Sequence, residues 1–80
     1  MNLHFKIATF YEFKTVDNLQ YLSKFLNFFC KTNQLLGTII IAPEGMNGTM
    51  AGLPTAIDDF ANYVKTLDFH NLNIKYSKTL

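Results

Sequence analysis

The feature that most constrains the fold is the spacing of apolar residues, which changes between two periods along the chain. From Leu3 to Phe13 the sequence alternates, which is typical of a half-buried β-strand with one mostly apolar side. That side carries Leu3, Phe5, Ile7, Thr9, Tyr11 and Phe13, and the other carries His4, Lys6, Ala8, Phe10 and Glu12. After a possible cap at Asp17 or Asn18, helical spacing through about Thr32 predicts a helix with an apolar stripe of Leu19, Leu22, Phe25, Leu26 and Phe29.

The middle of the chain predicts a hairpin. Residues 35–42, LLGTIIIA, are rich in β-branched side chains and apolar on both sides, which favours a well-covered strand or one inside a sheet. Pro43 cannot donate to a sheet ladder and ends that strand. Asn47 and Gly48 both tolerate positive φ and form the strongest short-range turn signal, so the return strand is expected over residues 48–52.

The last third of the chain predicts a second helix and a final strand. Pro54 suits the first helical turn, and the apolar stripe is Ile57, Phe60, Ala61, Val64 and Leu67. Asp58 and Asp59 fall in the early turns, where the helix dipole favours negative charge. Residues 72–78 alternate again, with Leu72, Ile74 and Tyr76 inward.

The predicted order β-α-β-β-α-β fits one small domain. At this length it predicts an α+β, ferredoxin-like βαββαβ sandwich over residues 1–80. Two helices would cover one face of a four-stranded antiparallel sheet. The other face would be free for partners.

The charged residues limit the possible partners. All seven cationic side chains are lysines, and the net charge is +1. Without arginine, whose planar fork binds phosphate bidentately and stacks on bases, neither tight phosphate chemistry nor base-specific readout is expected here. The lone Cys30 and an amino terminus unlike a secretion signal favour a cytoplasmic location. No apolar run approaches the roughly 20 residues that span a bilayer, so no membrane association is expected.

The sequence contains no complete catalytic or metal-binding set. Neither phosphate-loop glycine spacing occurs. Acylphosphatases share the predicted topology, but they hold phosphate with an arginine in the loop after the first strand, and here that loop is Lys14 to Asp17. His4 and His70 have no metal-spaced companions and are expected on the surface. We therefore predict no catalytic residue, metal or cofactor in this domain.

Two further residues have a functional and a structural interpretation. RNA-recognition motifs also have this topology and stack bases on aromatic residues of two central strands. Phe10 could supply one such ring, but the expected third strand has none, so a partly covered surface aromatic or a docking contact is favoured. Cys30 lies near the edge of the helical stripe, where packing as a small hydrophobe is favoured over a reactive thiol.

The stretch from Gly37 to Gly52, GTIIIAPEGMNGTMAG, contains all four glycines. It resembles the amino-terminal domain of bacterial rhodanese-like proteins that hydroxylate the wobble uridine of tRNA with oxygen. Their strand reads approximately G-T-[IL]-[IL]-[IL]-A-x-E-G-[IM]-N-G-[ST]-[IM]-A-G. The opening strand and both helices are also similar, so the resemblance covers essentially all 80 residues.

The resemblance implies an acylphosphatase-like accessory domain. In the family it precedes a rhodanese domain with the active-site cysteine in a Cys-x-x-Gly-x-Arg loop. Cys30 is followed by Lys31, Thr32 and Asn33, so no catalytic residue is carried over. The implied role is in an oxygen-dependent tRNA wobble-uridine 5-hydroxylase, contributing to tRNA binding or shaping the rhodanese active site. The implied partners are the carboxy-terminal rhodanese domain of the same protein and, through the full-length protein, tRNA.

The candidate binding residues are those of the family-motif loop: Glu44, Gly45, Met46, Asn47 and Gly48. Turn geometry explains Asn47 and Gly48. The Glu44 carboxylate is expected to bond to N–H groups of the turn, with a catalytic role as the alternative. The alternative function for the whole chain is a stand-alone binding or protein-interaction module that uses its open sheet face and has no catalytic activity.

Overall fold

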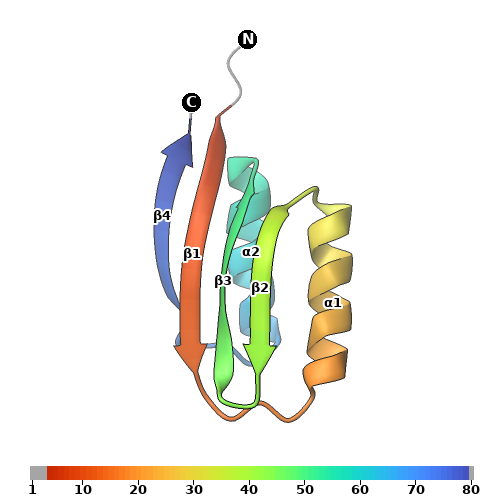
Figure 1. Cartoon of the computed structure of the whole chain (residues 1–80). Helices are drawn as coiled ribbons and strands as arrows, with labels where there is room; N and C mark the ends of the chain where they lie inside the picture. The colour runs from red at the N-terminus through yellow and green to blue at the C-terminus, as the bar shows by residue number, and fades with distance from the viewer. Residues whose placement is uncertain (1–3, 80) are drawn as a thin grey trace.

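The fold is the predicted ferredoxin-like sandwich. A computed structural model describes residues 4–79. The elements are β1 (Phe5–Phe13), α1 (Leu19–Thr32), β2 (Leu36–Ala42), β3 (Gly45–Gly52), α2 (Pro54–Thr66) and β4 (Asn73–Thr79). The strand order β2-β3-β1-β4 has antiparallel neighbours throughout. Figure 1 shows α2 behind the sheet and α1 beside β2, which leaves one face of the sheet uncovered.

The less apolar side of β1 faces the helices. Ala8, Phe10 and Glu12 are buried, whereas Phe5, Tyr11 and Phe13 are exposed. The expectation that Phe10 is a surface aromatic is therefore wrong, because its side chain is only 1% exposed. Leu3, which the alternation places on the apolar side, lies outside the described residues.

Phe10 is buried because its neighbour on β3 has no side chain. Phe10 lies directly opposite Gly48, and a Cβ added to Gly48 would be 3.0 Å from Phe10 Cζ and would overlap the carbonyl oxygen of Thr38. The Phe10 ring packs against Phe60 of α2, with the ring centroids 5.2 Å apart. The Phe60 ring in turn packs against Phe29 of α1, with the centroids 6.2 Å apart. This group of rings joins the sheet to both helices.

The hairpin turn lies at Pro43 and Glu44, so the turn predicted at Asn47 and Gly48 is wrong. Ala42 pairs with Gly45, and Asn47 and Gly48 lie within β3, paired to both of its neighbours. Proline presets φ for the first central position of such a turn. Gly45, which follows the turn, has a φ of 151°, whereas Gly48 does not have a positive φ.

β2 is an edge strand, which corrects the expected interior position. Its two apolar sides have different surroundings. Ile39 and Ile41 face the helices and are half-buried, whereas Leu36 and Ile40 lie on the uncovered face and are exposed. One apolar side of β2 therefore packs against the core, and the other apolar side belongs to the surface.

The two helices begin and end where their patterns predict, with three differences in detail. Asn18 is the N-cap of α1 but makes no side-chain capping hydrogen bond. Phe25, assigned to the buried stripe, is exposed. Asp58 lies beyond the first turn of α2, and its Oδ1 accepts a hydrogen bond from Lys6 Nζ at 2.7 Å. The buried residues of the helices are Leu22, Leu26, Ile57, Phe60 and Val64.

β4 follows the predicted alternation, although one inward residue is only partly covered. Ile74 and the preceding Leu72 are half-buried. Tyr76 points to the same side but stays exposed, with Lys6 Nζ 4.3 Å from its ring centroid. The inward pattern is therefore confirmed, and the end of the strand has little cover.

The orientation of β1 predicts a large loss of stability when Phe10 is truncated and almost none when Phe13 is truncated. Phe10→Ala should lower the free energy of unfolding by about 3–5 kcal/mol, because it empties the centre of the core. Phe13→Ala, at an 82% exposed position, should change it by less than about 0.5 kcal/mol. Urea denaturation measures both, with Phe10→Leu as a milder variant if Phe10→Ala does not fold. Equal losses at Phe10 and Phe13 would contradict the assigned orientation.

Candidate functional site

The uncovered face of the sheet, called here the open face, carries half of the large hydrophobic side chains that are exposed among the described residues. Cross-strand pairing places Ile7, Ala51 and Leu36 in one row, and Tyr11, Asn47 and Ile40 in another. Phe5 and Phe13 lie at the two ends of β1 on the same face. Several large apolar side chains exposed on one face of a small domain indicate an interaction site.

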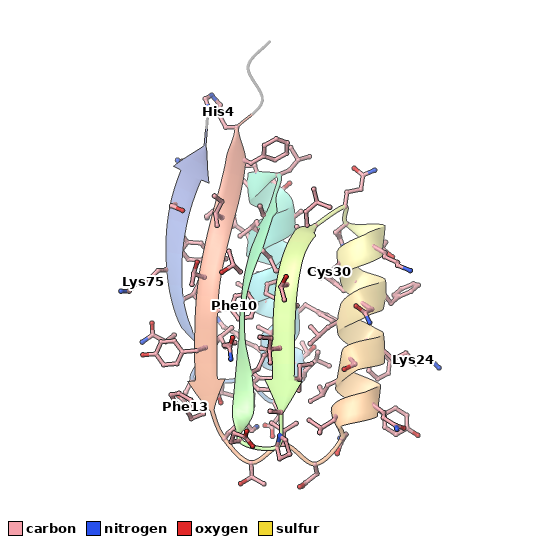
Figure 2. All side chains as sticks on the ribbon, in the orientation of Figure 1. His4, Phe10, Phe13, Lys24, Cys30 and Lys75 are labelled. Atoms are coloured by element: carbon pink, nitrogen blue, oxygen red, sulfur yellow. The ribbon has the colours of Figure 1, made fainter. Side chains whose placement is uncertain are left out.

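The open face is almost free of charge. By register it also holds Thr9, Thr49 and Thr38 in a polar row between the apolar ones, with Lys75 of β4 at the end of that row. Lys75 is the only charged side chain among the described residues of this face. Figure 2 shows Lys75 on β4 and Phe13 at the carboxyl end of β1. The face can therefore bury apolar area but provides little attraction for phosphate.

A second exposed aromatic group lies on α1. Tyr21, Phe25 and Phe28 recur at helical spacing on one side of the helix and are all exposed. They lie on a different element from the open face. The group offers matched exposed positions against which changes on the open face can be compared.

The five predicted loop residues do not form one cluster. Glu44 is exposed in the turn and Asn47 is exposed on the open face, whereas Gly45 and Met46 are buried. Gly48 is half-buried and faces Phe10. Met46 belongs to the hydrophobic core, which accounts for an apolar residue there. The binding role of this loop stays a prediction, and only Glu44 and Asn47 present exposed side chains for it.

The hairpin turn is bonded to the β1–α1 loop. Lys14 N donates to the Glu44 carbonyl at 3.0 Å, and Val16 N donates to the Pro43 carbonyl at 2.9 Å. These two loop N–H groups are therefore already bonded and do not point at a phosphate. The predicted bond from the Glu44 carboxylate to turn N–H groups is wrong, because within residues 4–79 its side chain has no hydrogen bond.

Glu12 is a buried polar residue that the sequence reasoning missed. Its side chain is 8% exposed, and Oε1 accepts a hydrogen bond from Asn71 N at 2.9 Å. The bond ties the end of β1 to the loop before β4. The available signal was the period of two, because a strand that buries Phe10 must also direct Glu12 inward.

Lys14 and Asp68 form an ion pair beside this bond. Lys14 Nζ donates to Asp68 Oδ2 at 2.9 Å and also to the Asp68 carbonyl oxygen. The hydrogen bond and charge of Lys14 lower the pKa of Asp68 below its ordinary value. His70, whose Nε2 lies 3.0 Å from Asp68 Oδ1, contributes in the same direction.

Cys30 packs as predicted, partly buried against the core. Burial raises the pKa of its thiol, so less of it is the reactive thiolate near neutral pH. His4 and His70 are both exposed. Within residues 4–79 no three His, Cys, Asp or Glu side chains are grouped to hold a metal. The helices described are too short and too polar to cross a membrane.

Comparison with known families identifies the domain. Residues 5–79 match the family described as the UPF0176 acylphosphatase like domain. The chain belongs to the UPF0176 family. The match extends over the described strands and helices, including the Gly37 to Gly52 stretch.

Three relatives of this UPF0176 domain are each named tRNA uridine(34) hydroxylase. The chain is 38% identical over 78 residues to the protein of that name from Bartonella quintana, covering 96% of the chain and 26% of the relative. It is 44% identical over 57 residues to that of Bradyrhizobium diazoefficiens, covering 71% and 22%. With Ehrlichia ruminantium the identity is 36% over 73 residues, covering 91% and 26%. The chain thus spans about a quarter of the length of these curated relatives.

The buried hydrogen bond predicts a structural role for Glu12. Glu12→Ala should lower the free energy of unfolding by about 1–3 kcal/mol, because Asn71 N–H loses its acceptor. Glu12→Gln keeps an acceptor and should lose less. Glu44→Gln, at an exposed side chain, should stay within about 0.5 kcal/mol of the parent. Urea denaturation ranks the three, and a larger loss at Glu44 than at Glu12 would contradict these roles.

The Lys14–Asp68 pair predicts a measurable titration shift. Lys14→Gln should raise the pKa of Asp68 towards its ordinary value, as followed by NMR of the carboxyl carbon. Because the folded pKa is the lower one, the pair stabilises the fold above the unfolded pKa, and this contribution is lost as the pH falls through the folded pKa. Lys65→Gln is the control, and an unchanged Asp68 pKa in Lys14→Gln would disprove the pairing.

Proposed function

We propose that this UPF0176 domain is the amino-terminal accessory domain of a tRNA uridine-34 hydroxylase, and that its open face docks on the catalytic remainder. The observation that carries the proposal is the nearly uncharged, apolar open face on a domain that matches about a quarter of each hydroxylase relative. The remainder is expected to include the rhodanese domain with the catalytic cysteine. This domain then supplies no catalytic residue and no cofactor.

Charge favours docking on protein over docking on tRNA for this face. Nucleic-acid binding draws on several lysine or arginine contacts to phosphate. Lys6 and Lys14 are engaged in ion pairs with Asp58 and Asp68, and of the lysines that the structure describes only Lys75 lies on the open face. The aromatic and aliphatic side chains instead resemble the core of a protein interface, where charged residues are depleted. The domain therefore shapes the active site, and tRNA is held by the full-length cytoplasmic protein.

The alternative function is a stand-alone interaction module that uses the same open face for another protein. Phe13 and Leu36, at 82% and 76% exposed, are the residues such a partner would cover first. The two functions differ in whether the domain supports hydroxylation when it is joined to the remainder of a relative. A chimera separates them.

The test is a Bartonella quintana hydroxylase in which this chain replaces the matching segment. We expect this chimera to form 5-hydroxyuridine at position 34 of tRNA, and the 80-residue chain alone to form none. Phe13→Glu with Leu36→Glu in the chimera should lower the rate by about tenfold or more, equivalent to roughly 1.4 kcal/mol of lost interaction. Phe28→Glu, at a 70% exposed position on α1, is the matched control and should keep the parent rate.

Two outcomes would contradict the proposal. Full activity of the open-face variant would show that the remainder does not dock there. An inactive chimera whose domain is folded, as judged by its amide NMR spectrum, would favour the stand-alone module. Circular dichroism melting of each variant verifies that a lost rate does not reflect unfolding.

A further inference from the structure

The two edges of the sheet are protected differently. The β4 edge carries Lys75 and Lys78, and charged side chains of this kind prevent pairing with foreign strands. The β2 edge, Leu36–Ala42, reads LGTIIIA and contains no charge and no proline. An uncharged strand of seven residues at an edge is suited to pairing with another strand.

The outer side of β2 has unused backbone groups. Within residues 4–79 β2 pairs only with β3, and no other backbone hydrogen bond involves residues 36–42. Alternate N–H and C=O groups of an edge strand point away from its one partner. These groups form a ladder on which a further strand can bond.

A hollow lies beside this ladder, between β2 and α1. It measures 260 Å³, and its β2 side is formed by Gly37, Ile39 and Ile41. Asn27, Cys30 and Lys31 belong to its α1 side, and Figure 2 shows Cys30 on the side of α1 towards β2. The volume is below the roughly 300–1,000 Å³ of small-molecule sites. It suits side chains of an added strand, since every second one points to the helix side.

The positive charge at the hollow favours an added strand that carries an acidic side chain. Among the residues that the structure describes, Lys31 is the one charged residue that lines the hollow, and no Asp or Glu occurs between residues 18 and 43. A second copy of this chain would bring a second Lys31 to the same edge. It would also bring its own α1 to the β2 edge, where Figure 1 shows α1 already present. A single extended peptide with an acidic residue avoids both conflicts.

We propose that the β2 edge and this hollow bind an extended segment from the remainder of the hydroxylase, added as a fifth strand. The segment would place apolar side chains in the hollow and an acidic side chain near Lys31. This is β-strand addition, in which backbone bonds supply affinity and the hollow supplies specificity. The inference rests on the proposed function, because it takes the segment from the same enzyme.

Amide hydrogen exchange in the Bartonella quintana chimera tests this proposal. The outward N–H groups of β2 should exchange at least about tenfold more slowly in the chimera than in the 80-residue chain, equivalent to roughly 1.4 kcal/mol of added protection. The outward N–H groups of β4 should be unchanged and serve as the internal control. NOEs between Hα protons of β2 and of the added segment should identify the fifth strand directly.

Variants separate this strand pairing from docking on the open face. Lys31→Glu should remove most of the added β2 protection, whereas Lys65→Glu on α2 should leave it intact. Phe13→Glu alone, which leaves β2 unchanged, should lower hydroxylation while the β2 to segment NOEs persist. An active chimera with unprotected β2 overturns this inference and leaves the proposed function standing. An inactive chimera in which β2 is protected contradicts the proposed function and leaves the strand pairing standing.

Discussion

The contact between Phe10 and Gly48 is the constraint on which the rest of the fold depends. The two residues lie opposite each other on the central strands, and only a residue without a side chain leaves room for the ring. The ring then reaches Phe60 of α2, and through it Phe29 of α1. One missing Cβ thus permits a compact core in a chain of 80 residues, for which the total stability is only about 4–12 kcal/mol.

The same contact determines the character of the surface. Because side chains alternate along a strand, burying Phe10 also buries Ala8 and Glu12 and directs Phe5, Tyr11 and Phe13 outward. The buried Glu12 needs a hydrogen bond and obtains it from Asn71, which fixes the loop before β4. The outward aromatics form the open face. Core packing and the proposed docking site therefore result from one choice of strand orientation.

The order of the elements and most of their bounds could be predicted from the sequence, whereas the start of β3 and the orientation of β1 could not. Hydrophobic spacing distinguishes helix from strand locally, and the topology follows from the order. Alternation alone does not decide which side of β1 meets the helices, because the more apolar side faces outward and the side with Ala8, Phe10 and Glu12 is buried. That decision depends on Gly48, which is 38 positions away in the chain and looks, beside Asn47, like a turn residue. The turn formed at Pro43 and Glu44 because proline fits its first central position and Gly45 takes the positive φ that follows.

The two proposed contacts of this domain reinforce each other physically. Leu36 and Ile40 belong both to the unprotected edge strand and to the open face. A strand added to β2 would widen that face by one strand, so a docking surface and a strand-pairing edge would be covered by the same polypeptide. Ordering a flexible segment costs conformational entropy. A segment already bound along β2 has lost this entropy before the remainder binds the open face.

An isolated domain would leave both the apolar face and the uncharged edge open to aggregation. Covering them together would account for the lack of lysine on the β2 edge and for the single lysine, Lys75, among the described residues of the open face.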